Sequence, residues 1–237
     1  MIDLLSIARM LIAPAVHLSM GEQKIDDTAI KSVHIKTQTK RREDLQNCLR
    51  HYTVLMGFKN STRDKIVTSV LKFADMNGCD LNLGKDSTLY DKFDKLIDNF
   101  NILYYECCSV VPSNKNNNPR DLTSLTSKAL WCCYPNAVPL YDRFAQNAVW
   151  VLGRLTDIKP DSRFMKQRYA AFSYIWIKMY DEVLPLINQA DLKGYPNKVR
   201  VFDRILWIIG EENYNRDPYK AGSRAARRKD DASLKPY

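Results

Sequence analysis

One lysine and one aspartate in the segment 126–145, "TSKALWCCYPNAVPLYDRFA", have types and spacing that suit chemistry. Lys128 interrupts an apolar helical stripe, and Asp142 follows a Pro-Leu-Tyr turn. A partly buried lysine near the start of a helix is pushed toward its neutral amine, which is a nucleophile able to form a Schiff base. A fixed aspartate is an anion that can stabilise a developing sugar cation or orient an attacking water or amine.

Both residues also have a purely structural interpretation. The Lys128 side chain could lie along its helix and extend the ammonium into water. Asp142 stands where a helix of about residues 143–152 should begin, and aspartate is a favoured N-cap. For Asp142 the two roles agree, because capped backbone N–H groups hold the carboxylate as an anion. For Lys128 the structural and the nucleophilic alternatives both remain open.

Apolar residues recur at helical spacing along most of the chain, and no segment shows the sustained alternation that strands need. The pattern predicts a core or amphipathic helix at the N-terminus and helices at about 43–56, 61–77 and 87–108. It predicts two more within 126–152, split at Pro135–Pro139, then a long helix from about Asp161 and a last one at 197–212. Ser61 is the expected N-cap of the 61–77 helix, and Ser87 or Asp86 that of the next. Gly210 is expected near the end of the last helix.

The fold class predicted from these elements is all-α, with two packed helical lobes. The stretch 112–120, "PSNKNNNPR", is the clearest loop in the chain, because it combines two prolines with four asparagines. We place a lobe boundary there. The predicted division is an N-terminal helical lobe (1–118), a catalytic helical lobe (119–213) and a basic C-terminal tail (214–237).

Composition indicates the partner and the compartment. The 237-residue chain has a formal net charge of +9, which fits a polyanion such as nucleic acid. Its six cysteines include no C-x-x-C, so we expect reduced, buried thiols and neither a metal nor a cofactor. Charged residues and Pro14 interrupt the apolar N-terminus, so we expect no membrane span and a cytoplasmic protein.

The same segment resembles the catalytic segment of the 8-oxoguanine DNA glycosylase branch of the helix-hairpin-helix glycosylases. That segment has a T-K step opening a helix, a P-x-A-V-P turn and then the catalytic aspartate. The matching stretches here are 126–128, 135–139 and Asp142. Bacterial members with this fold are more similar still, with an S-K-x-L step (127–130), a P-[IL]-Y-D turn (139–142) and a late F-D-x-x-L-W segment (202–207). Some of them act in antiphage defence on modified phage DNA.

The resemblance implies a helix-hairpin-helix glycosylase-like fold with double-stranded DNA in its cleft and a DNA N-glycosylase activity. It assigns Lys128 as the Schiff-base lysine and Asp142 as the essential aspartate. The family's glycine-rich hairpin is replaced by "RDLTSLTSK", so other groups must hold phosphates. The expected DNA contacts are Arg120, Ser124, Thr126, Ser127 and Arg143, with the basic tail. The candidates for contacts to a flipped base are Trp131, Tyr134, Tyr141, Trp150 and Trp176.

Several alternatives stay open at this point. The attacking group is either Lys128, which would add AP lyase activity, or a water. The excised base is a modified base of phage DNA, which we favour, or an oxidised guanine in housekeeping repair. A non-catalytic DNA-binding protein on the same scaffold would share the charge and the fold. We expect a monomer whose partner is DNA, phage DNA included, and not a membrane.

Overall fold

The computed structural model describes residues 3–35, 40–77, 93–113 and 119–216, and within them the chain forms eight α-helices and no strand. The all-α prediction is therefore confirmed. The helices are α1 (Leu4–His34), α2 (Arg41–His51), α3 (Asn60–Asn77), α4 (Phe93–Val110), α5 (Thr123–Cys133), α6 (Arg143–Leu155), α7 (Arg168–Gln189) and α8 (Lys198–Arg216). A short 3-10 turn, η2 (Ser162–Phe164), precedes α7.

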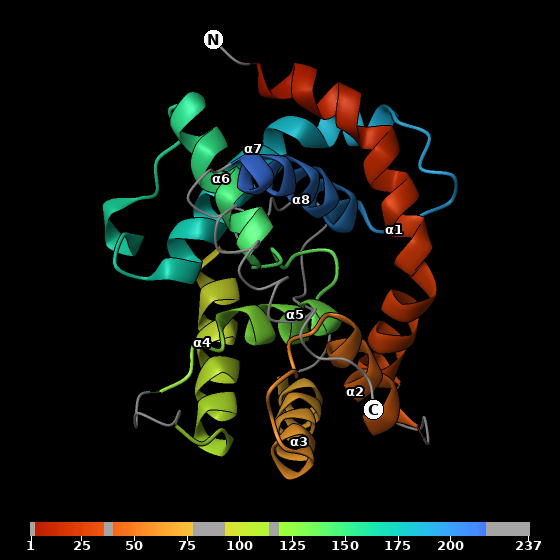
Figure 1. The fold of residues 1–237 in the computed structure, drawn as a ribbon, viewed down its shortest axis with the longest axis vertical. Coiled ribbons are helices and arrows are strands. Elements are labelled where there is room, and N and C mark those ends of the chain that lie inside the picture. Colours follow the sequence, from red (N-terminus) through yellow and green to blue (C-terminus); the bar gives the residue numbers. More distant parts are fainter. Residues whose placement is uncertain (1–2, 36–39, 78–92, 114–118, 217–237) are drawn as a thin grey trace, which may run out of the picture.

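Helix α1 connects the two ends of the molecule. Figure 1 shows α1 along one side, with α2 to α5 toward one end and α6 to α8 toward the other. α1 packs against α2, α5, α7 and α8, and buried side chains from all eight helices form one hydrophobic cluster. The segment between α4 and α5 contains the predicted loop 112–120. Because the core is continuous across it, the division into two lobes stays a prediction.

The N-terminal helix spans 31 residues and includes Pro14. The side chain of Asp3 caps it by accepting a hydrogen bond from the Leu5 backbone N–H. Ala8, Ala15 and Ala29 are fully buried against the helices that α1 contacts. By length and composition α1 could also cross a membrane, a test that core helices of soluble proteins pass too. The cytoplasmic location accordingly remains a prediction.

Helices α6 and α8 approach each other closely at Gly210. A Cβ atom built on Gly210 would lie 1.9 Å from the backbone oxygen of Phe144, so no larger residue fits between the two backbones. Gly210 was expected near the end of its helix, but it lies inside α8 as a packing residue. This contact places the first turn of α6, and with it Asp142, against α8.

The helix predicted at 43–56 ends early, at His51. Thr53 adopts a left-handed conformation (φ 60°). The Val54 N–H then bonds the Leu49 carbonyl, and the Thr53 N–H bonds the Arg50 carbonyl, which is the Schellman pattern that ends helices. A β-branched residue rarely adopts this conformation, so nothing in the sequence indicated a stop here. Met56, the last residue of the predicted helix, lies beyond α2 and is 69% exposed.

Two other boundaries also differ from the prediction. The helix expected from Asp161 begins at Arg168, because Asp161 caps the 3-10 turn η2 instead. Ser61 lies inside α3, which begins at Asn60, and is not its N-cap. The proposed caps Asp86 and Ser87 and the basic tail from 217 onward lie outside the described residues.

The Gly210 contact can be tested by adding one methyl group. We expect Gly210→Ala to lower the free energy of unfolding by about 1–3 kcal/mol or more, since a rigid backbone and not a flexible side chain must move. Gly21→Ala is the matched control. It lies in a helix with nothing within 4 Å of its added Cβ and should stabilise by up to ~1 kcal/mol. Urea denaturation measures both, and equal effects would contradict the close approach.

Candidate active site

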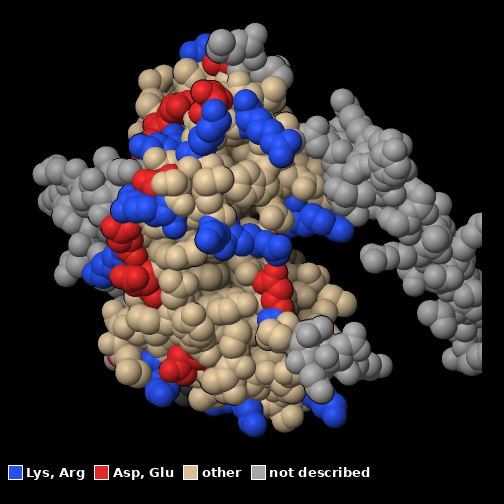
Figure 2. Space-filling view, turned by 90° about the vertical axis from the view of Figure 1, so that its left-hand side faces the viewer, with Lys and Arg blue, Asp and Glu red and all other residues tan. Residues whose placement is uncertain are grey.

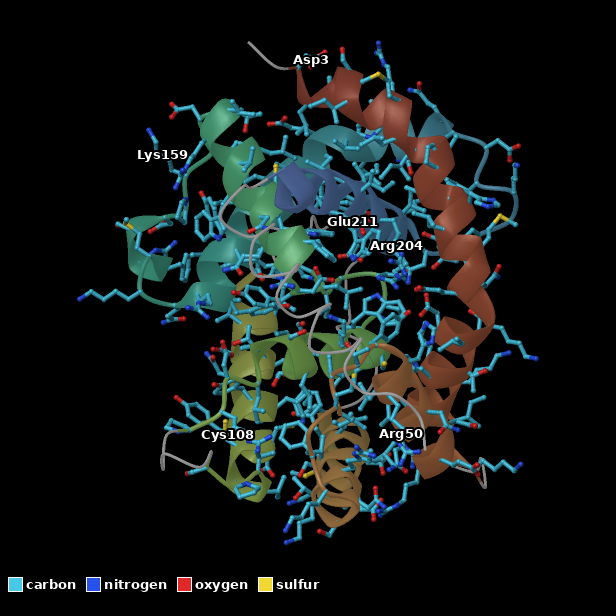
Figure 3. All side chains as sticks on the ribbon, in the orientation of Figure 1. Asp3, Arg50, Cys108, Lys159, Arg204 and Glu211 are labelled. Carbon is cyan, nitrogen blue, oxygen red and sulfur yellow. The ribbon has the colours of Figure 1, made fainter. Side chains whose placement is uncertain are left out.

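A cavity of about 670 Å³ lies where five segments of the chain meet. It is lined by Glu22 of α1, by several residues from His51 at the end of α2 to Phe58, by several from Arg120 to Lys128 around the start of α5, by residues 142–144 at the start of α6, and by three residues of α8. Its volume is within the ~300–1,000 Å³ typical of small-molecule sites. Figure 3 labels one lining residue, Arg204, near the centre of the molecule.

The cavity lining is rich in charged groups, with basic residues in excess. Its five Lys and Arg residues are Arg120, Lys128, Arg143, Arg200 and Arg204, and its three acids are Glu22, Asp121 and Asp142. Figure 2 shows that basic side chains are also spread over one outer face, interspersed with acidic ones. The positive charge on that face is therefore not one isolated patch, and a polyanion can be attracted without binding a single basic cluster.

Hydrogen bonds between α5 and the following turn bring the two candidate catalytic residues together. The Ser127 hydroxyl accepts a hydrogen bond from the Tyr141 backbone N–H at 3.0 Å. The Tyr169 hydroxyl donates to the Pro139 carbonyl at 3.0 Å. The turn is thus fixed across α5, and Lys128 Nζ lies 3.9 Å from Asp142 Oδ2.

Asp142 is the N-cap of α6, as the sequence predicted. Its Oδ1 accepts hydrogen bonds from the backbone N–H groups of Phe144 and Ala145, both at 2.9 Å. The other carboxylate oxygen, Oδ2, faces Lys128. The side chain is 25% exposed and lines the cavity, and one of its oxygens is held by the helix while the other lies near Lys128. The hydrogen bonds to Oδ1 thus keep the carboxylate oriented on the cavity wall.

Lys128 lies in the second turn of α5, and its side chain is only 8% exposed. Nζ donates a hydrogen bond to the Ser124 hydroxyl at 3.2 Å. Burial lowers the pKa of Lys128 below its usual value, although the nearby Asp142 and Asp203 carboxylates oppose that shift. The interpretation of Lys128 as a surface lysine with its ammonium in bulk water is therefore wrong. Its amine instead borders the cavity, where burial makes the charged form less stable than it is in water.

A buried ionic network forms another wall of the cavity. The Arg200 guanidinium donates to Asp203 Oδ2 at 2.6 Å and to Glu22 Oε2 at 2.7 Å, and it pairs with Asp26 at 3.4 Å. Burial raises the pKa of Tyr52, which remains a neutral phenol and donates to Asp26. Burial also raises the pKa of Asp203 to about 6. The network ties α1, the turn after α2 and α8 into one unit.

The predicted DNA-binding residues separate into two groups. Arg120, Ser124 and Arg143 line the cavity, and Arg120 also stacks on Phe58, with 4.9 Å from its guanidinium carbon to the ring centroid. Thr126 and Ser127 are fully buried. The prediction that these two hydroxyls contact phosphates is wrong for this conformation, because a phosphate cannot reach them from outside.

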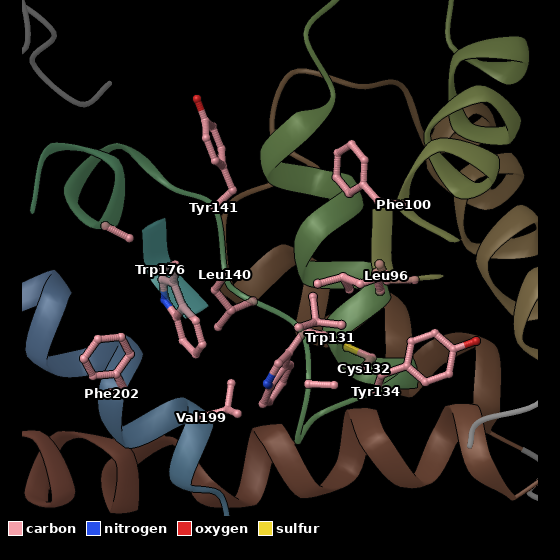
Figure 4. Close-up of a cluster of buried hydrophobic side chains, with 14 of the residues drawn as sticks. Leu96, Phe100, Trp131, Cys132, Tyr134, Leu140, Tyr141, Trp176, Val199 and Phe202 are labelled. Carbon is pink, nitrogen blue, oxygen red and sulfur yellow. The ribbon is translucent and has the colours of Figure 1, made fainter. Parts of the chain in front are cut away.

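The predicted base-contacting aromatics lie elsewhere. Trp131, Tyr134, Tyr141 and Trp176 are buried in the core, where Figure 4 shows Trp176 near Phe202 and Leu140. Trp150 is half-buried on α6 and does not line the cavity. All five assignments are therefore corrected: large aromatics at helical spacing bury their area first. Trp131 contributes indirectly, since its ring lies 5.7 Å from the Arg200 guanidinium carbon.

Four aromatic residues that the sequence did not predict as site residues line the cavity: Tyr52, Phe58, Phe144 and Trp207. Phe144 and Trp207 meet edge to face, with ring centroids 5.2 Å apart. Two signals were available for them, because Phe144 follows Asp142 by two residues and Trp207 ends the late F-D-x-x-L-W segment. No local pattern indicated Tyr52 or Phe58, since they reach the cavity only through the turn after α2.

Comparisons of the chain with models of known protein families, with characterised proteins and with solved structures found no match. The chemistry of the cavity must therefore be argued from its own residues.

The structural role of Ser127 can be separated from a phosphate contact. We expect Ser127→Ala to lower the free energy of unfolding by about 1–3 kcal/mol, because the buried Tyr141 N–H loses its acceptor. Ser109→Ala is the control: its exposed hydroxyl bonds the carbonyl of Glu106 within α4, and its effect should stay within ~0.5 kcal/mol. Weakened DNA binding with unchanged stability would contradict this role.

Proposed function

We propose that this protein is a DNA N-glycosylase that excises a flipped-out modified base in the 670 Å³ cavity. The observation that carries the proposal is the pair Lys128 and Asp142, 3.9 Å apart on the cavity wall. A buried amine beside an oriented carboxylate, open to a space of this size, suits attack at a sugar carbon. The resemblance of residues 126–142 to glycosylase catalytic segments points to the same reaction.

In this proposal Asp142 stabilises the positive charge that develops on the deoxyribose as the bond to the base breaks. Its Oδ1 is held by two backbone N–H groups, so no reorganisation is needed when the charge appears. Oδ2 lies 3.9 Å from Lys128 Nζ. The same oxygen is placed to take a proton from the attacking group.

Lys128 supplies the nucleophile in the version of the reaction that also gives lyase activity. Its neutral amine attacks C1′, the bond from C1′ to the base breaks, and the departing base takes up a proton. The attached amine then gives up one proton, the bond from C1′ to the ring oxygen breaks, and that oxygen takes up a proton, which leaves a protonated Schiff base between C1′ and the lysine nitrogen. In the version with hydrolysis alone, a water attacks C1′, and Lys128 and Asp142 orient it. Both versions use the same two residues.

The remaining lining residues fit a nucleotide. Arg120 and Arg143 carry charges suited to the phosphates on either side of the target. The rings of Phe144 and Trp207 offer an apolar surface for a base withdrawn from the duplex. Removal of a modified base from phage DNA in defence, and removal of an oxidised guanine in repair, are both consistent with this arrangement. Defence is the version we favour.

The proposed activity is tested by counting abasic sites. Incubation with normal, oxidised and phage-modified DNA, followed by alkali, should yield strand breaks on at least one substrate. Asp142→Asn should lower the rate on the order of 100-fold or more, because the fixed anion is lost. Asp157→Asn, at an 83% exposed position after α6, is the control and should leave the rate unchanged.

Two outcomes would count against the proposal. An absence of strand breaks on every substrate would remove the glycosylase activity. DNA binding that persists in such a protein and is the same in the Asp142→Asn variant would favour the non-catalytic DNA-binding alternative.

The role of Lys128 needs a separate measurement. Borohydride added during the reaction should trap the wild-type protein covalently on DNA through the Schiff base, while Lys128→Gln should give at least ~100-fold less adduct. Lys166→Gln, at an exposed position before α7, should trap normally. Full trapping by the Lys128→Gln variant would show that another amine attacks. No trapping by wild type, with base release intact, would assign the attack to water.

A further inference from the structure

Glu22 lines the cavity, and its two carboxylate oxygens differ in how many hydrogen bonds they accept. Its Oε2 accepts a hydrogen bond from Arg200 at 2.7 Å, is paired with Arg204, and lies 3.2 Å from the Tyr52 hydroxyl. Its Oε1 faces His51 Nε2 at 3.7 Å, which is too long for a hydrogen bond. Oε2 is therefore saturated, and Oε1 keeps its capacity to accept a hydrogen bond from a ligand.

The carboxylate is held rigidly and stays charged. Burial works against the charge, but Arg204 and Arg200 outweigh it and hold the pKa of Glu22 below its usual value. Arg200 itself is held by Asp26 and Asp203, so the anchor of Glu22 is fixed by α1 and α8 together. Such preorganisation is what a recognition group needs, because a ligand then bears little cost of ordering it.

An anion at this wall determines what can occupy the space beside it. A phosphate would be repelled by Glu22, and so would a carbonyl oxygen placed against Oε1. An amino group would be attracted, since it supplies the hydrogen that Oε1 lacks; carboxylates contact the cytosine amino group in DNA in this way. His51 stands next to it, with Nε2 3.7 Å from Oε1, and an imidazole N–H is a hydrogen-bond donor. The pair offers an acceptor beside a donor.

We infer that Glu22, together with His51, reads the exocyclic amino group of the flipped base. The substrate class is then a base that carries an amino group, of the cytosine, adenine or guanine type, and keto-only bases of the thymine, uracil or hypoxanthine type are rejected. His51 donates to the acceptor atom next to the amino group. This inference rests on the proposed function, because it assumes that a base enters the cavity, and it assigns Glu22 to specificity and not to bond cleavage.

The test uses pairs of DNA duplexes that differ by one exocyclic group. One pair carries a single 5-hydroxymethylcytosine or 5-hydroxymethyluracil, and the other carries adenine or hypoxanthine. Base release and equilibrium binding are both measured, the latter with Asp142→Asn so that the base stays attached. Wild type should favour the amino member about 10-fold or more, as expected for one good base-edge contact. Glu22→Gln should reduce this ratio to about 3-fold or less, because an amide can also donate to a carbonyl.

Controls separate selectivity from folding. Glu182→Gln, the same change at an exposed position of α7, should keep the wild-type ratio. The side chain of His51 is 41% exposed, and His51→Ala should also lower the preference for the amino member. This variant provides the test if thermal denaturation shows that Glu22→Gln is not folded.

The failures of the two proposals are distinguishable. An amino-to-keto ratio near one in wild type, or a ratio that neither variant changes, overturns the inference about Glu22 even when bases are released. Absence of base release on every duplex overturns the proposed function, and the binding ratios then decide the inference alone.

Discussion

A buried guanidinium must be neutralised by nearby carboxylates, and the structure depends on meeting this requirement for Arg200. Its partners Glu22 and Asp26 lie on α1, and Asp203 lies one turn away on α8. Removing one partner of such a buried pair typically costs about 3–5 kcal/mol. The long N-terminal helix, the last helix and the turn that carries Tyr52 are therefore held in one relative arrangement, and that arrangement forms one wall of the cavity.

The part of the cavity that contains Lys128 and Asp142 depends on backbone contacts. Ser127 fixes the turn before Asp142, and Gly210 allows the start of α6 to lie against α8. Asp142 then has a structural and a chemical role that share one cause, because the N–H groups that it caps also hold its charge. Lys128 faces it from a helix that is buried almost throughout. The candidate catalytic residues thus lie on a helix and at a helix N-terminus.

Local patterns predicted some parts of the fold well. The apolar spacing of residues such as Ile66, Val70 and Phe73 predicted a buried helix face that α3 does present, and Asp142 before Arg143 predicted an N-cap. The predicted helix ends were wrong where no residue pattern marks the end. α2 stops because Thr53 takes a left-handed conformation, and Gly210 sits inside α8 because α6 passes directly over it.

By itself, the sequence determined the helical class, the cap at Asp142 and the segment that carries Lys128, since these depend on spacing within one or two turns of helix. Only the tertiary structure decided which side chains border the cavity. The sequence predicted that Trp131 and Trp176 contact the base, yet both are buried in the core. Burying large aromatic rings lowers the free energy of the folded state most. Glu22 and Trp207 reach the same cavity from helices far apart in the chain, and no short-range pattern carries that information.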